Sequence, residues 1–155
     1  MTGSSEAPPP CGICVLIDRI RAGTFDDLAA ELTHSYVILG DAQFYRGDCA
    51  LLFKRHATTL HQLPAAEARG WFDEILMTAS AIDAIVKPAR LNHECLGNQE
   101  HHLHWHVFPR MAEDPMRLAP VWLRPENERK VSLEIDDKRK LIDSIRAELS
   151  NRQSS

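Results

Sequence analysis

The sequence predicts an α+β domain in which a mostly antiparallel sheet packs against one main helix. Short apolar segments typical of strands, one long stretch with apolar residues at helical spacing, and turn residues between them indicate this class. The 155 residues are 44% hydrophobic, which is enough for one domain with a real core. We expect a disordered Ser/Pro/Ala-rich tail over residues 1–10, a main domain over 11–125 and a helical extension over 126–155.

The first third of the chain predicts one short helix and three strands. Residues 15–20 suit a short helix that ends before Gly23. Residues 27–32 and 36–39 read as the two strands of a hairpin, with the turn at 33–35. Residues 49–53 are continuously apolar, which favours a buried central strand.

The rest of the chain predicts the main helix, two more strands and a terminal helix. Pro64 suits a first helical turn, and apolar residues recur at helical spacing from there to about Val86, before Pro88. Residues 90–95 read as a strand, and a turn at 97–99 leads into a last strand. After an irregular, proline-rich segment to Pro125, residues 133–149 predict a polar helix with one apolar stripe.

Charge and composition exclude several classes of protein. The net charge of −4 argues against binding nucleic acid by bulk electrostatics. No apolar run is long enough to span a membrane, and the N-terminus lacks the basic and apolar regions of a signal peptide. We therefore predict a cytoplasmic protein with no membrane or nucleic-acid partner, in which the four cysteines are reduced.

Three histidines stand at alternate positions in the last predicted strand. Side chains alternate between the faces of a strand, so His102, His104 and His106 point one way and Leu103 and Trp105 point toward a core. Three neighbouring imidazoles would repel one another if all were protonated. The arrangement therefore indicates a chemical task, such as handling an anion or a metal.

The middle histidine, His104, is suited to act as a nucleophile on phosphorus. Attack requires one unprotonated ring nitrogen, with the other held as a donor, often to a backbone carbonyl. His102 and His106 could hold phosphate oxygens or stabilise developing charge. Asn98 and Gln99, in the loop before the strand, are placed to supply further donors.

The pair Cys11-x-x-Cys14 supplies half of a tetrahedral zinc site. His56, after the buried strand, and His102 are the candidates for the other two ligands. The alternatives are a redox dithiol or two unliganded thiols. A redox dithiol usually lies at a helix N-terminus in a βαβ unit, and the predicted order of elements lacks that unit.

The segment His102–Phe108 resembles the signature of the histidine triad (HIT) superfamily. The resemblance extends over roughly residues 11–123, including Cys11-x-x-Cys14, the strand that ends before His56, and the long helix. The segments 91–98, 102–110 and 114–115 together resemble bacterial members of the diadenosine polyphosphate hydrolase type.

The resemblance implies a nucleotide hydrolase or transferase that acts at the α-phosphate through a covalent nucleotidyl-histidine. It makes His104 the nucleophile, His106 a phosphate contact and His102 the third triad member. It assigns Asn98, with Gln99 beside it, to the phosphate and Asp41 approximately to the ribose hydroxyls. Relatives also imply a homodimer with the long helix at the interface, and a structural zinc ion on Cys11, Cys14, His56 and His102.

Two positions depart from the pattern of that family. Many relatives carry a fourth histidine, in a Gly-His pair, where this chain has Gly47-Asp48. A proline often precedes the triad in bacterial relatives, and here that residue is His101. We hypothesise that His101 protonates a leaving group at the entrance of the strand.

The sequence therefore favours an enzyme that cleaves a phosphoanhydride or phosphoramidate of a nucleotide. It shows no magnesium ligand cluster, so we expect that the chemical step requires no metal. The alternative is a non-catalytic nucleotide- or zinc-binding module. A third possibility is a transferase that uses the same intermediate with an acceptor other than water.

Overall fold

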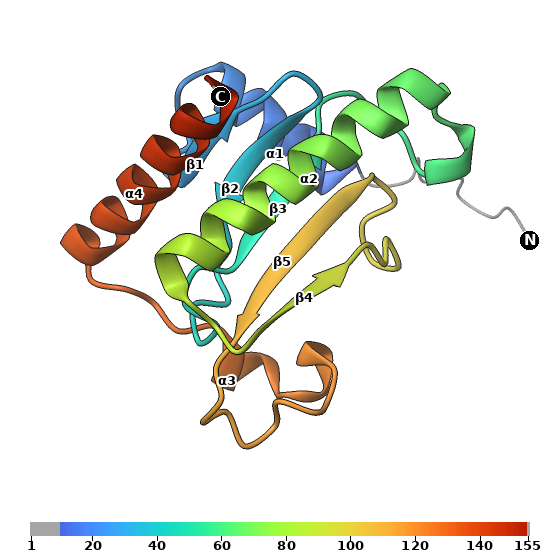
Figure 1. The fold of residues 1–155 in the computed structure, drawn as a ribbon. Helices are drawn as coiled ribbons and strands as arrows, with labels where there is room; N and C mark the ends of the chain where they lie inside the picture. The colour runs from blue at the N-terminus through green and yellow to red at the C-terminus, as the bar shows by residue number, and fades with distance from the viewer. Residues whose placement is uncertain (1–9, 155) are drawn as a thin grey trace, which may run out of the picture.

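The computed structural model describes residues 10–154, and these form one five-stranded antiparallel sheet with helices on both faces (Figure 1). The strand order is β1-β2-β3-β5-β4. The predicted tail lies outside the described residues except for Pro10. The elements are α1 (Gly12–Arg21), β1 (Leu28–Glu31), β2 (Ser35–Leu39), β3 (Cys49–Phe53), α2 (Ala65–Val86), β4 (Arg90–Glu94), β5 (His104–Arg110), α3 (Glu126–Arg129) and α4 (Ile135–Gln153), with 3₁₀ turns at Leu60–Gln62 and Val121–Leu123.

The apolar strand β3 lies at the centre of the sheet, as predicted. It pairs with β2 on one side and with β5 on the other, and all five of its residues are buried. Cys49, Leu51 and Phe53 face the core under α2, whereas Ala50 and Leu52 face a second apolar cluster under α1. A strand covered on both faces needs apolar residues at every position, which is why it lacks polar alternation.

The residues at the two ends of helix α2 set its limits. Pro64 is its N-cap, and Lys87 is the C-cap with a left-handed backbone (φ 52°) that reverses the chain before Pro88. Between these ends the helix buries Trp71, Ile75 and other apolar residues against the sheet. The predicted main helix is confirmed.

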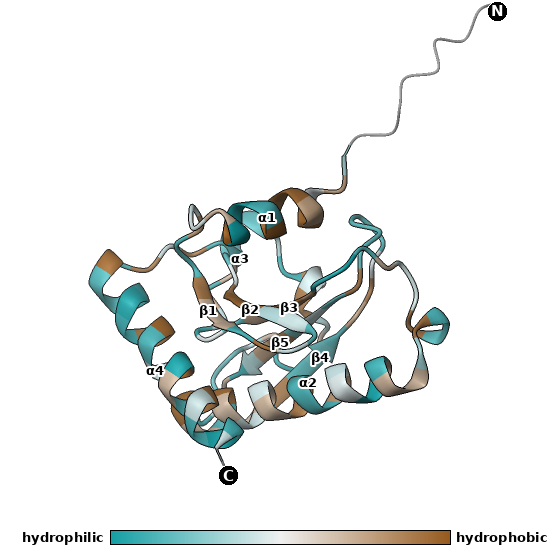
Figure 2. Ribbon diagram, turned by 90° about the horizontal axis from the view of Figure 1, so that it is seen from above, coloured by the Kyte–Doolittle hydropathy of each residue, from teal (hydrophilic) through white to brown (hydrophobic). Residues whose placement is uncertain are grey.

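Three of the helices cover the sheet, and not the one main helix that the fold prediction placed against it. Figure 2 shows α1 on one face and both α2 and α4 on the other. In α4, Leu141, Ile142, Ile145 and Leu149 are buried in the same core cluster as α2 and β3. The sequence predicts a helical extension over 126–155, and α4, which lies in this range, forms one wall of the main core. Helix α3 is an addition to the prediction.

The irregular segment after β5 is held by a buried network of charges. Arg110 is almost fully buried, and its guanidinium donates to Asp114 Oδ2 and to the backbone oxygens of Met116 and Ala119. Arg124 donates to the other oxygen of Asp114. These contacts fix residues 111–124 at one end of the sheet, although that segment contains little regular structure.

None of the helices between residues 10 and 154 is long and apolar enough to span a membrane.

Candidate active site and metal centre

A cavity of about 390 Å³ opens beside the histidine face of β5. His104 and His106 form part of its floor, and the loop before β5 forms one side. Because side chains alternate along a strand, both imidazoles leave the sheet on the face opposite α2. The residues that line the cavity are Leu96, Gly97, Asn98, Gln99, Glu100, His104, His106, Trp122 and Arg129.

The imidazole of His104 is oriented by the main chain. Its Nδ1 lies 2.7 Å from the backbone oxygen of His102, so Nδ1 carries a proton and donates it to that oxygen. In the neutral ring Nε2 is then the unprotonated nitrogen. His104 therefore has one ring nitrogen held as a donor to a backbone carbonyl, as expected of a nucleophilic histidine.

The imidazole of His106 is half-buried between aromatic groups. Its ring stacks on Phe108 with centroids 5.2 Å apart, and it meets His104 and Trp122 edge to face. Burial and, to a smaller extent, the neighbouring His104 together lower the pKa of His106 to about 4. At neutral pH His106 is therefore an uncharged group in the ligand-free protein.

A second cluster lies next to this cavity and contains the two N-terminal cysteines. One potential ligand atom from each of Cys11, Cys14, His56 and His102 lies within 4.8 Å of the others. His102 Nδ1 lies 3.4 Å from Cys11 Sγ and 3.5 Å from Cys14 Sγ, and His56 Nδ1 lies 3.4 Å from Cys14 Sγ. The structure thus brings together all four predicted zinc ligands.

The spacing and chemistry of these four groups fit zinc. Zinc–sulfur bonds of about 2.3 Å and zinc–nitrogen bonds of about 2.0–2.1 Å in a tetrahedron separate S from N by about 3.6 Å. The sulfur–nitrogen distances in the cluster are 3.4–3.5 Å. His102 Nε2 also donates to the backbone oxygen of Phe53 at 2.8 Å, the kind of outer contact that fixes a metal-binding histidine.

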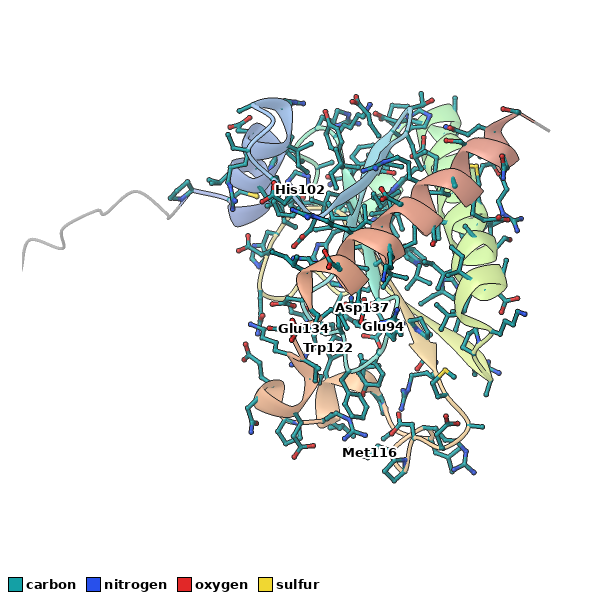
Figure 3. The ribbon with its side chains drawn as sticks, turned by 90° about the vertical axis from the view of Figure 1, so that its left-hand side faces the viewer. Glu94, His102, Met116, Trp122, Glu134 and Asp137 are labelled. Atoms are coloured by element: carbon teal, nitrogen blue, oxygen red, sulfur yellow. The ribbon has the colours of Figure 1, made fainter. Side chains whose placement is uncertain are left out.

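The structure corrects the placement of His102. Its imidazole is 1% exposed and turns to the thiols, and it does not line the cavity with His104 and His106. His102 lies on the α1 side of the sheet and Leu103 packs in the core under α2, so the predicted alternation holds, but the contacts of His102 on that face are the two thiols. Two imidazoles, and not three, therefore face the cavity. Figure 3 shows His102 beside α1.

The remaining predicted residues separate into two groups. Asn98 and Gln99 line the cavity, as the sequence suggested. Asp41 does not line it; its exposed carboxylate lies 3.4 Å from Lys130 Nζ. His101 is exposed and is also outside the lining, because it sits in the loop that turns into the strand. The role of His101 stays a prediction.

Two lining residues come from the irregular segment and from the short helix that follows it. Trp122 lines the cavity, and its indole donates from Nε1 to Glu94 of β4 (Figure 3). The guanidinium of Arg129 lies over the Trp122 ring, 4.7 Å from the centroid, and among the described lining residues it is the one arginine or lysine. No sequence motif pointed to Arg129, because it lies 23 positions beyond His106 in a segment without a clear pattern.

No protein-family profile matches the sequence, and no curated protein matches it. Several solved histidine triad proteins have a similar fold. One from Bradyrhizobium japonicum is 23% identical with a TM-score of 0.67, and the match covers 84% of this chain and 94% of that one. One from Sinorhizobium meliloti is 18% identical with a TM-score of 0.72, covering 83% and 93%.

A zinc-bound histidine triad family protein from Mycobacterium smegmatis is 19% identical with a TM-score of 0.65, and the match covers 94% of this chain and 96% of that one. These likenesses confirm the predicted fold class. The narrower resemblance to the diadenosine polyphosphate hydrolase type stays a prediction. The chain has the fold of the histidine triad proteins.

Proposed function

We propose that this chain is a histidine triad nucleotide hydrolase or nucleotidyl transferase with His104 as its nucleophile. The hydrogen bond from His104 Nδ1 to the backbone oxygen of His102 carries the proposal, because it leaves Nε2 free beside a cavity. A second imidazole and two amide side chains line the same cavity and can hold the oxygens of a phosphate.

The reaction proceeds in two displacements. His104 Nε2 attacks the α-phosphorus, the bond from phosphorus to the leaving oxygen or nitrogen breaks as that leaving atom takes up a proton from solvent, and a nucleotidyl group remains on Nε2. Water then attacks the same phosphorus and gives up a proton, and the nitrogen–phosphorus bond breaks to release a nucleoside monophosphate. In a transferase, another nucleophile takes the place of water. Asn98 and His106 donate to the phosphate oxygens.

We propose zinc as a structural ion on Cys11, Cys14, His56 and His102. When bound, zinc would join the N-terminal segment to His56, after β3, and to His102, before β5. The chain's own residues already join these segments, since the backbone N–H of Gly12 donates to Glu100 Oε2 at 3.0 Å. Zinc takes no part in the two displacements.

We also propose a homodimer formed through α2. Phe72 and Leu76 of this helix are 49% and 50% exposed, and Phe72 lies against Trp105 of β5. Large apolar side chains grouped on one helix mark a surface that binds another protein. Light scattering of the protein should give twice the chain mass, and Phe72→Glu should shift it toward the monomer.

A product assay tests the proposed activity. Wild type is incubated with dinucleoside polyphosphates and with adenosine phosphoramidates, and a nucleoside monophosphate is the expected product. His104→Ala should lose turnover by at least about a thousandfold while it still binds the nucleotide. His61→Ala, which removes an exposed histidine from the Leu60–Gln62 turn, is the matched control and should keep wild-type rates.

Trapping of the intermediate separates an enzyme from the alternative binding module. Rapid acid-free quenching of wild type with substrate should yield protein heavier by one nucleotidyl group, located on His104. Nucleotide binding with neither turnover nor adduct on any substrate would favour the non-catalytic nucleotide- or zinc-binding module. Product transfer to an added acceptor would identify a transferase.

A further inference from the structure

Asp48 is a buried carboxyl group on the histidine face of the sheet. It immediately precedes β3 and has the same parity as Ala50 and Leu52, which pair with His106 and His104 in β5. Its side chain is almost fully buried, and its Oδ1 has no hydrogen-bond partner among the described residues. A buried unpaired carboxyl oxygen costs free energy and calls for an explanation.

The backbone leaves space for this carboxyl group. Gly40 lies opposite Asp48 in the chain reversal after β2, and its N–H donates to the Asp48 backbone oxygen at 2.9 Å. A Cβ at residue 40 would collide with Asp48 Oδ2. Because residue 40 is a glycine, the chain leaves room for the Asp48 carboxyl group at this position.

The imidazole of His106 faces the carboxyl group of Asp48. Its Nδ1 lies 4.0 Å from Asp48 Oδ1, and this nitrogen is also buried without a hydrogen-bond partner. Two unpaired atoms of opposite hydrogen-bonding capacity thus face each other. A shift of about 1 Å brings them to ordinary hydrogen-bond distance.

The charges around the pair favour an uncharged state. Burial raises the pKa of Asp48 well above its usual range, and the negative charge of Asp41 adds to that shift, whereas Arg129 opposes it. Glu94 raises this pKa further. The pKa of His106 is low for the reasons given above, so both shifts favour a proton on the carboxyl group over one on the imidazole.

We propose that Asp48 is a positioning residue that donates a hydrogen bond to Nδ1 of His106 and supplies it with a proton during phosphoryl transfer. The inference rests on the proposed function. With Nδ1 as acceptor, His106 carries its own proton on Nε2 and directs it to a phosphate oxygen. This chain thereby places a carboxyl group where many histidine triad proteins have a fourth histidine.

The proton moves as charge develops on the phosphate. The O–H bond of Asp48 breaks and an N–H bond forms at His106 Nδ1, which leaves a carboxylate and an imidazolium. The imidazolium stabilises the negative oxygens of the transition state, and the carboxylate is neutralised by its contact with that ring. The proton returns when the phosphate leaves, so no external acid is consumed.

Asp48→Asn tests the transfer, because the amide keeps the shape and can donate a hydrogen bond but cannot release its proton. At pH 8 we expect kcat to fall at least about tenfold with KM within about threefold. The loss should shrink toward pH 5, where His106 can take a proton from solvent. A ratio of wild-type to variant kcat that does not change with pH, or a change in KM alone, overturns the proposal. Asp26→Asn makes the same change at an exposed carboxylate and should keep the wild-type profile.

A measurement on the ligand-free protein separates this inference from the proposed function. In ¹⁵N NMR spectra of histidine-labelled wild type at pH 7, His106 should carry its proton on Nε2, with Nδ1 as an acceptor. A proton on Nδ1 overturns the role of Asp48 whether or not the protein turns over nucleotides. Absence of turnover in wild type with His106 protonated on Nε2 would contradict only the proposed function.

Discussion

His104 Nδ1 lies 2.7 Å from the backbone oxygen of His102, while the imidazole of His102 lies among the two cysteines. One short segment therefore orients the proposed nucleophile with its main chain and supplies a metal ligand with its side chain. The two sites are adjacent because the peptide between these histidines belongs to both.

This contact predicts the tautomer of His104. Because Nδ1 donates to a carbonyl, the neutral ring should carry its proton on Nδ1 and leave Nε2 bare. ¹⁵N NMR of histidine-labelled protein should show this directly, and the trapped nucleotidyl group should be bonded to Nε2. An adduct on Nδ1 would contradict the orientation described above.

The cysteine cluster predicts one zinc ion per chain in the purified protein. Cys14→Ser should reduce the bound zinc, as measured by elemental analysis, and should lower the melting temperature, because a ligand that binds only the folded state stabilises it. Cys95→Ser is the matched control, since Cys95 is half-buried and lies outside the cluster. Equal zinc content in Cys14→Ser and wild type would exclude this site.

The Arg110–Asp114 pair predicts a large effect on stability. Arg110→Met leaves the buried carboxylate of Asp114 with one cationic partner fewer, so the free energy of unfolding should fall by about 3–5 kcal/mol. Denaturant titration checks this value. Arg117→Met, at an exposed arginine of the same segment, should change stability by less than about 0.5 kcal/mol. Similar losses in both variants would mean that the network is not what holds the segment.

Trp122 predicts an effect on substrate binding. Its ring meets His106 and Phe108 edge to face at 5.6 and 5.5 Å, and it closes one side of the cavity. Trp122→Ala should raise KM about three- to tenfold, corresponding to the loss of one aromatic contact. Trp122→Phe should restore most of the affinity. An unchanged KM in the alanine variant would place the substrate elsewhere in the cavity.

The raised pKa of Asp48 predicts that replacing this carboxyl group with an amide stabilises the protein, by an amount that depends on pH. Its raised pKa means that the folded protein holds this proton more tightly than the unfolded chain, whose value is close to 3.8. Unfolding therefore releases a proton above that pH, and the contribution of this group to stability falls as the pH rises.

Asp48→Asn removes the ionisation and should stabilise the protein by about 1–3 kcal/mol at pH 8. The gain should become small near pH 4, where the wild-type carboxyl group is protonated in the folded protein and only partly ionised in the unfolded chain. Thermal unfolding of wild type and variant at both pH values measures the difference. A gain that is larger at pH 4 than at pH 8 would show that the pKa of Asp48 is not raised.

Local sequence patterns predicted the elements because each depends on short-range physics. A continuous apolar run indicated the buried β3, helical spacing indicated α2, and alternation placed His104 and His106 on one face. The Cys-x-x-Cys spacing indicated half of a metal site, and the family resemblance named His56 and His102 as its completion. The geometry of the cluster agrees with that choice.

Long-range packing decided what the patterns could not. The sequence by itself determined the strands, the main helix and the histidines and cysteines from which the two candidate sites are built. Only the tertiary structure turned His102 away from the cavity, brought Trp122 and Arg129 into it, and buried Asp48 against His106. Periodicity reports which face of an element a residue occupies, whereas these contacts depend on which distant segment covers that face.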